Sequence, residues 1–178
     1  MRDRWRDSLD TFGNEAHAYV AGTNSSADFV IAKRTFNLEA ALAEVRAGRL
    51  RGAALRKAIK LAEEFGKAAG ANELRKYLVD PTSFAGDAAP VEVRERVAQG
   101  MGALRAMGHR LSRTEQMLKR HGVIGTINRI GINPKASDNF ERLRGANLVH
   151  LTAEAIVLDY PHLFDSKAIA IARKRLGQ

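Results

Sequence analysis

The chain has 178 residues, of which 29 are Lys or Arg and 20 are Asp or Glu, so its formal net charge is +9. This length and a 45% hydrophobic content are sufficient for a packed core. The absence of cysteine excludes disulfides, thiolate zinc sites, iron–sulfur clusters and cysteine nucleophiles. No apolar stretch approaches the roughly 18 residues that span a bilayer, and the N-terminus lacks the apolar core of a signal peptide. We therefore expect a soluble, cytoplasmic protein.

Residues that favour helices dominate the whole sequence, and only four prolines interrupt it. Because β-branched residues rarely alternate over more than a few positions, strands are not expected. The sequence predicts an all-α fold, a helical bundle of about seven to nine helices. The stretch 80–90 contains two prolines and a glycine without helical periodicity. We expect it to join a lobe of residues 1–80 to a lobe of residues 90–178, or to lie within one packed domain.

In the N-terminal half, the clearest helix is predicted from 38 to 47, with Asn37 as its N-cap and Gly48 at its end. Upstream, residues 29–31 (FVI) fit an extended segment as well as a helix. Asn72 is predicted to cap the last helix of this half. The remaining helices predicted here cover residues 3–21, 26–34, 52–69 and 72–79.

In the C-terminal half, apolar residues at steps of three and four predict a packed seam on a helix from about 91 to 110. Ser112 and Glu115 have the spacing of a capping box for a helix to His121, which Gly122 can end. The seam consists of Val93, Val97, Gly100, Leu104, Met107 and Leu111. The remaining helices predicted here cover residues 123–130, 137–159 and 166–176.

Positive charge is unevenly distributed along the chain. Before Pro90 there are 14 basic and 12 acidic residues, and after it there are 15 basic and 8 acidic residues. A further basic focus lies between 46 and 60, where six cations occur without an acid. For any single arginine a solvated surface position is the simpler interpretation, but the summed field favours a polyanionic partner such as nucleic acid. The residues expected to bind its phosphates are Arg49, Arg56, Lys60, Arg94, Arg105, Arg110, Arg113, Arg120 and Arg129.

The stretch 61–78 comes closest to a sequence-reading helix-turn-helix, because Ala62 and Gly66 occupy positions that such motifs require. Its apolar anchors Leu74 and Leu78 come about two residues late, which favours ordinary helix packing. Aromatic residues make up only 6% of the chain and none lies among the basic runs, so base stacking is not expected. The sequence therefore predicts binding to the phosphate backbone of RNA or DNA without strong sequence preference.

No recognisable catalytic motif occurs: nucleophile-elbow, P-loop and dinucleotide-binding patterns are absent, and the five histidines match no metal-ligand pattern. His150 and Glu154 would share a helix face, where a metal or acid–base role is conceivable, but ordinary surface polarity is favoured. Gly100, Gly102 and Gly108 are expected to lie on a helix and to permit close helix approach. We expect no enzymatic activity, no cofactor and no metal site.

In build alone (all helical, basic and cysteine-free) the chain is similar to the small helical subunits of RNA-guided CRISPR effector complexes, which line guide and target strands. That resemblance implies a subunit of a larger nucleoprotein complex with other protein subunits as partners. The alternative is a protein–protein interaction module (adaptor, inhibitor or effector) whose basic face meets an acidic partner. A membrane partner is not expected, because the lone Trp5 lies among alternating charges rather than on an apolar face.

Overall fold

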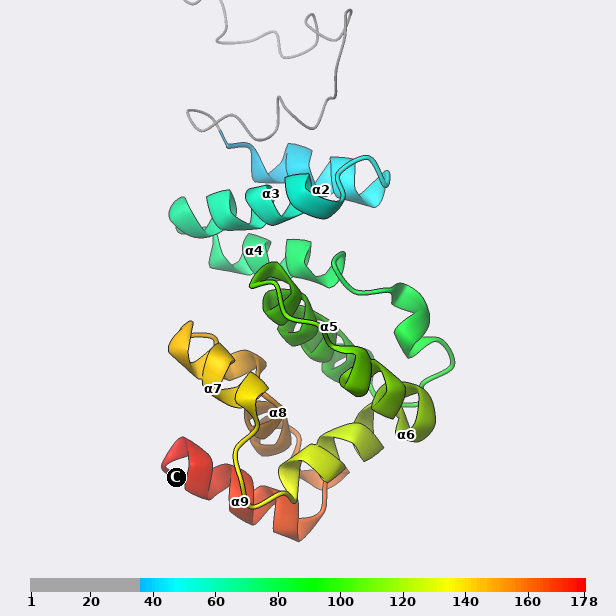
Figure 1. Cartoon of the computed structure of the whole chain (residues 1–178), viewed down its shortest axis with the longest axis vertical. Helices are drawn as coiled ribbons and strands as arrows, with labels where there is room; N and C mark the ends of the chain where they lie inside the picture. Colours follow the sequence, from blue (N-terminus) through cyan, green and yellow to red (C-terminus); the bar gives the residue numbers. More distant parts are fainter. Residues whose placement is uncertain (1–35) are drawn as a thin grey trace, which may run out of the picture.

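The computed structural model describes residues 36–178, and all regular secondary structure in this part of the chain is helical, with no strand. Eight α-helices and three short 3-10 helices follow one another within it (Figure 1). The prediction of an all-α fold with seven to nine helices is confirmed. The predicted helices 3–21 and 26–34 lie outside the described residues. None of the described helices combines the length and the apolar character needed to cross a bilayer.

The α-helices are α2 (Leu38–Arg46), α3 (Gly52–Glu64), α4 (Ala68–Lys76), α5 (Val91–Ala106), α6 (Ser112–Gly131), α7 (Asp138–Gly145), α8 (Ala153–Asp159) and α9 (Ser166–Leu176). The 3-10 helices are η1 (Pro81–Phe84), η2 (Val149–Leu151) and η3 (Pro161–Leu163).

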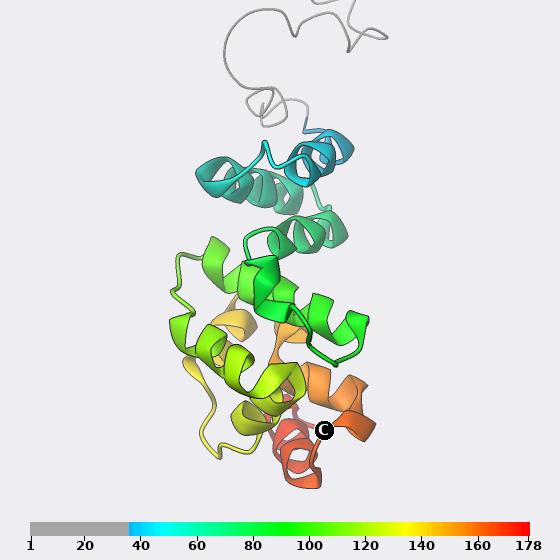
Figure 2. The same cartoon turned by 90° about the vertical axis from the view of Figure 1, so that its right-hand side faces the viewer.

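The helices are stacked along the long axis of the molecule. Figures 1 and 2 both show α2, α3 and α4 at one end, α9 at the other and α5 between them. Buried apolar side chains form an N-terminal core within 36–74 and a C-terminal core within 79–172. Because α4 packs against both α3 and α5, this helix links the two cores.

Helix α2 begins as the sequence predicts. The Asn37 side chain accepts a hydrogen bond from the backbone N–H of Ala40 at 3.1 Å, which satisfies one of the free donors of the first turn. Gly48, with a φ of 72°, follows the end of the helix. Both predicted ends of this helix are confirmed to within a residue.

The predicted helix 52–69 is wrong in its length, because Gly66 ends α3 earlier. Gly66 has a φ of 69°, and the N–H of Lys67 bonds the carbonyl of Ala62 at 2.7 Å, as in a Schellman motif. The chain then enters α4 directly. Asn72 therefore lies inside α4 and does not cap it, which corrects the second prediction for this segment.

Glycines let α5 approach its neighbours closely, as predicted. A Cβ atom at Gly100 would lie 2.6 Å from the backbone oxygen of Leu151, and one at Gly102 would overlap the backbone oxygen of Arg75. The predicted helix 91–110 is too long, because α5 ends at Ala106. Gly108, with a φ of 87°, lies outside the helix and has nothing within 4 Å of an added Cβ, so the prediction of close approach is wrong for this glycine. Of the predicted seam, Met107 is the exception: it is the C-cap residue of α5 and is exposed.

Helix α6 consists of two segments separated at Gly122, whose backbone is not helical (φ 66°, ψ −178°). The predicted end at His121 and the new start at Val123 are thereby confirmed. The capping box is wrong, since Ser112 makes no capping hydrogen bond and Glu115 instead forms an ion pair with Arg105.

The predicted long helix 137–159 is wrong: it is divided into α7, η2 and α8. Asn147 adopts a left-handed φ of 58°, which stops the first piece. Thr152 then starts α8, its hydroxyl accepting the N–H of Ala155 at 3.2 Å. The last predicted helix, 166–176, agrees with α9.

The segment 80–90 is attached to the C-terminal core. The Asp87 carboxylate accepts the N–H of Val123 at 2.7 Å and that of Ala89 at 2.8 Å. Phe84 packs against the apolar residues of this core. The segment thus closes over the break in α6.

Candidate nucleic-acid interface

A groove of about 890 Å³ lies between α3 and residues 146–150, with the end of α5 and one side of α4 also lining it. We call it the α3 groove. Its walls belong to different cores, because α3 is part of the N-terminal core and Leu148 packs against the C-terminal core. The ionisable residues that line it are Arg56, Lys57, Lys60, Glu63, Arg75 and His150.

A second hollow, of about 370 Å³, shares Arg56 with the α3 groove. We call it the Arg110 hollow. Its lining comes from α3, the end of α5 and the turn into α6. Arg56, Arg105 and Arg110 all line it, although 54 residues separate the first from the last. Three of the residues expected from the sequence to bind phosphate are therefore brought together.

Several of these cations have no acidic partner. Arg56, Lys57 and Arg110 are exposed, and within the described residues none of them forms an ion pair or a side-chain hydrogen bond. Lys60 Nζ lies 3.8 Å from Glu64 Oε1, and an exposed ion pair at this distance contributes little to stability. These four side chains leave a positive field along the α3 groove and the Arg110 hollow.

Arg75 has a different role in the same groove. Its side chain is 4% exposed and hydrogen bonds both Glu63 and Asn72. Asn72 Nδ2 in turn lies 3.3 Å from His150 Nε2. Burial, assisted by the charges of Arg96 and Arg75, lowers the pKa of His150. The neutral ring can then accept the Asn72 amide hydrogen, and the network joins α3, α4 and η2 across the floor of the groove.

Arg105 also acts within the protein. Its guanidinium donates to the backbone oxygen of Leu78 and pairs with Glu115, so it connects the end of α4 to α5 and α6. Half-buried Arg94 lies on the same helix but lines neither hollow.

The remaining predicted residues are dispersed. Arg49 lies in the turn before α3 and pairs with Glu44 at 2.8 Å, and this hydrogen bond and charge raise its pKa. It therefore does not extend the face shared by Arg56 and Lys60. Arg113 and Arg129 line a separate cavity in the C-terminal core. Arg120 is exposed on α6 and lines none of these hollows.

Lys57 was missed by sequence reasoning, although it stands within the basic focus 46–60. Its position next to Arg56 was the available signal. Nothing in the sequence indicates that Arg56 lies near Arg110, because their proximity depends on how α4 and α5 place α3 against the turn into α6.

Helices α3 and α4 form a helical hairpin about Gly66, within the stretch 61–78 that comes closest to a helix-turn-helix in sequence. Helix α4 lies between α3 and α5, and Ala71, Leu74 and Arg75 are buried in these contacts. Little of α4 is left to enter a DNA groove, which supports ordinary helix packing.

His150 and Glu154 do not share a helix, because α8 starts after Thr152. The expectation of surface polarity is wrong for Glu154, which is 1% exposed and bonds Arg175 Nη1 at 2.5 Å. Within the described residues, no three His, Asp or Glu side chains are grouped so that they could hold a metal ion. Comparison of the chain with protein-family models, curated proteins and solved structures finds no match.

Proposed function

We propose that the chain binds the phosphate backbone of nucleic acid in the α3 groove and the Arg110 hollow, without strong sequence preference. The observation that carries the proposal is the set of exposed, unpaired cations Arg56, Lys57 and Arg110 around two adjoining hollows. Guanidinium groups bind phosphate oxygens in pairs, and a concave arrangement lets cations contact successive phosphates. Such a surface would serve a free protein and a subunit of a nucleoprotein complex alike.

The lining of the two hollows supports recognition of the backbone rather than of the bases. Among residues 36–178, no Phe, Tyr or Trp side chain lines either of them, so this part of the chain provides no aromatic stacking on bases there. Binding should then depend mainly on the release of counterions, and affinity should fall steeply with salt.

The test is fluorescence anisotropy with labelled random-sequence DNA and RNA over a series of salt concentrations. The groove variant replaces Arg56, Lys57 and Arg110 with Gln. We expect it to weaken binding of all sequences and to flatten the log–log salt slope by roughly two to three, at about 0.7 to 0.9 per lost phosphate contact. The control variant replaces three exposed cations of α9, Lys167, Arg173 and Lys174, with Gln. It lowers the net charge by as much as the groove variant does.

Each outcome has a defined meaning. Loss confined to the groove variant supports the proposal, whereas equal loss in both variants means that net charge, not the groove, attracts nucleic acid. No binding by the parent protein at low salt rejects the proposal and favours the alternative, an acidic protein partner. Circular dichroism should show unchanged helix in both variants, because all six side chains are exposed.

A further inference from the structure

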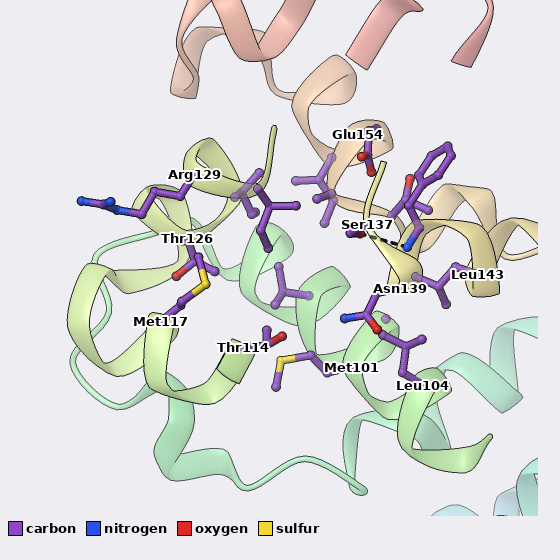
Figure 3. A pocket seen from close by; sticks show the side chains of 18 of the residues that line it. Met101, Leu104, Thr114, Met117, Thr126, Arg129, Ser137, Asn139, Leu143 and Glu154 are labelled. Atoms are coloured by element: carbon purple, nitrogen blue, oxygen red, sulfur yellow. Dashed lines mark hydrogen bonds between the residues drawn. The ribbon is translucent and has the colours of Figure 1, made fainter. Parts of the chain in front are cut away.

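The C-terminal core contains a cavity of about 290 Å³, separate from the basic hollows. Figure 3 shows it surrounded by α5, α6, α7 and the start of α8. We call it the α6 cavity, since both segments of the broken helix line it. Most of its lining is apolar. The main apolar contributors are Val97, Met101, Leu104, Leu118, Ile127 and Phe140.

Two buried polar side chains line this cavity with hydrogen-bonding capacity left over. Glu154 has a single partner in the described residues, Arg175, and that bond uses only Oε1. Its other carboxylate oxygen, Oε2, accepts no hydrogen bond from any residue of 36–178. The hydroxyl of Thr126, a residue 2% exposed, likewise has no partner in the part of the chain that the structure describes. Buried polar groups in native proteins are nearly always hydrogen bonded, so the Thr126 hydroxyl points to a missing partner in the cavity. Glu154 Oε2 is available to accept one further hydrogen bond there.

The charges around the cavity favour an uncharged occupant. The charge of Glu154 is already compensated by Arg175. An anion would lie against the Glu154 carboxylate, and a cation would share the lining with the basic side chains of Arg113 and Lys135. In Figure 3 the Arg129 side chain extends away from the other labelled residues, so its guanidinium is not placed to bind an occupant.

The size of the cavity limits the occupant further. Apolar cavities of roughly 150 Å³ accommodate benzene, and the α6 cavity is larger. Thr114, Met117 and Asn139 on its lining are only half-buried, which gives a small molecule a route from solvent. A fused pair of rings is therefore within its capacity.

We propose that the α6 cavity is a binding site for a small, uncharged, mainly apolar molecule that donates one N–H or O–H hydrogen bond to the Glu154 carboxylate. This site is independent of the backbone-binding surface, because none of Arg56, Lys57 and Arg110 lines it. It gives the chain a second class of ligand.

Indole and benzofuran are suitable probes, because they have nearly the same shape and only indole carries an N–H donor. Isothermal titration calorimetry and saturation-transfer NMR on the whole chain measure their binding. We expect indole to bind, and benzofuran to bind roughly tenfold or more weakly, because a hydrogen bond to a charged acceptor is lost. This comparison needs no variant and does not depend on a mutant folding.

A pair of variants then locates the bound probe. Val97→Phe places a ring in the cavity and should abolish indole binding. Val91→Phe makes the same change on α5 at a residue that is 53% exposed and outside the cavity, and it should leave binding intact. Absence of indole binding to the parent protein, equal binding of indole and benzofuran, or unchanged indole binding by folded Val97→Phe would each overturn the proposal.

Discussion

The backbone oxygen of Arg75 occupies the space in which a side chain at Gly102 would begin. This contact joins α4 to α5, and therefore the N-terminal core to the C-terminal core. The glycine lacks the Cβ atom that would push the two helices apart. The close approach of α4 and α5 at this point thus requires a glycine.

Replacing Gly102 with Ala should destabilise the protein by roughly 1–3 kcal/mol, because the added methyl group meets backbone that cannot rotate away. The higher helix propensity of Ala offsets only about 1 kcal/mol of this effect. The measurement is the free energy of unfolding in urea. Gly145→Ala on α7 is the control: nothing lies within 4 Å of its added Cβ, and it should be neutral or stabilising. If both substitutions changed the free energy of unfolding equally, the close approach at Gly102 would not contribute to stability.

Replacing Asp87 with Ala should lower the unfolding free energy by about 1–2 kcal/mol, the usual effect of removing an N-terminal cap. The carboxylate satisfies the N–H of Val123 at the start of the second segment of α6. Limited proteolysis should show faster cleavage within 80–90 in this variant. Asp80→Ala, which removes an exposed cap from η1, should have a smaller effect. Identical proteolysis of Asp87→Ala and the parent would show that the carboxylate does not hold this segment.

Replacing Arg175 with Met should cost roughly 3–5 kcal/mol, because it leaves the buried carboxylate of Glu154 without its counter-charge. Adding Glu154→Gln to this variant removes the stranded charge and should restore part of the loss. Denaturation of the two single variants and the double variant gives the coupling energy. Additive losses would mean that the two side chains do not interact.

Lowering the pH should weaken the fold through His150. Its folded-state pKa is lowered by burial and by the charges of Arg96 and Arg75, so the unfolded chain binds the proton more readily. The contribution of His150 to stability is complete above the pKa of the unfolded chain, about 6.5, and it declines as the pH falls below that value towards the lower pKa of the folded state. Between pH 7.5 and 5.5, the parent should lose more stability than His150→Gln. The control is His162→Gln at an exposed position, which should lose stability as the parent does. If His150→Gln also lost as much stability as the parent, the prediction would be contradicted.

The sequence predicted those features that depend on neighbouring residues. The cap at Asn37, the break at Gly122 and the helix 166–176 follow from local chemistry and agree with the structure. The prediction of a long helix 137–159 is wrong, because Asn147 and Thr152 interrupt the helical periodicity with a turn and a cap.

The site was less accessible to sequence reasoning, because its geometry depends on contacts between distant segments. The burial of Glu154 requires Arg175, 21 residues later, to fold back from α9. The sequence gives no sign that Arg105 is paired, whereas in the structure its guanidinium donates to Leu78 O and to Glu115. Sequence shows which side chains carry charge, whereas tertiary packing decides which charges stay unpaired.

The crossing of α4 and α5 has a consequence for the spacing of the charges. Arg56 and Lys57 belong to α3, on the side of the N-terminal core, and Arg110 follows α5 on the other side of this crossing. The interhelical distance therefore sets the span between cations on the two sides. Gly102 at the point of contact keeps that span short, because any larger residue there would meet the backbone oxygen of Arg75 and push the two helices apart.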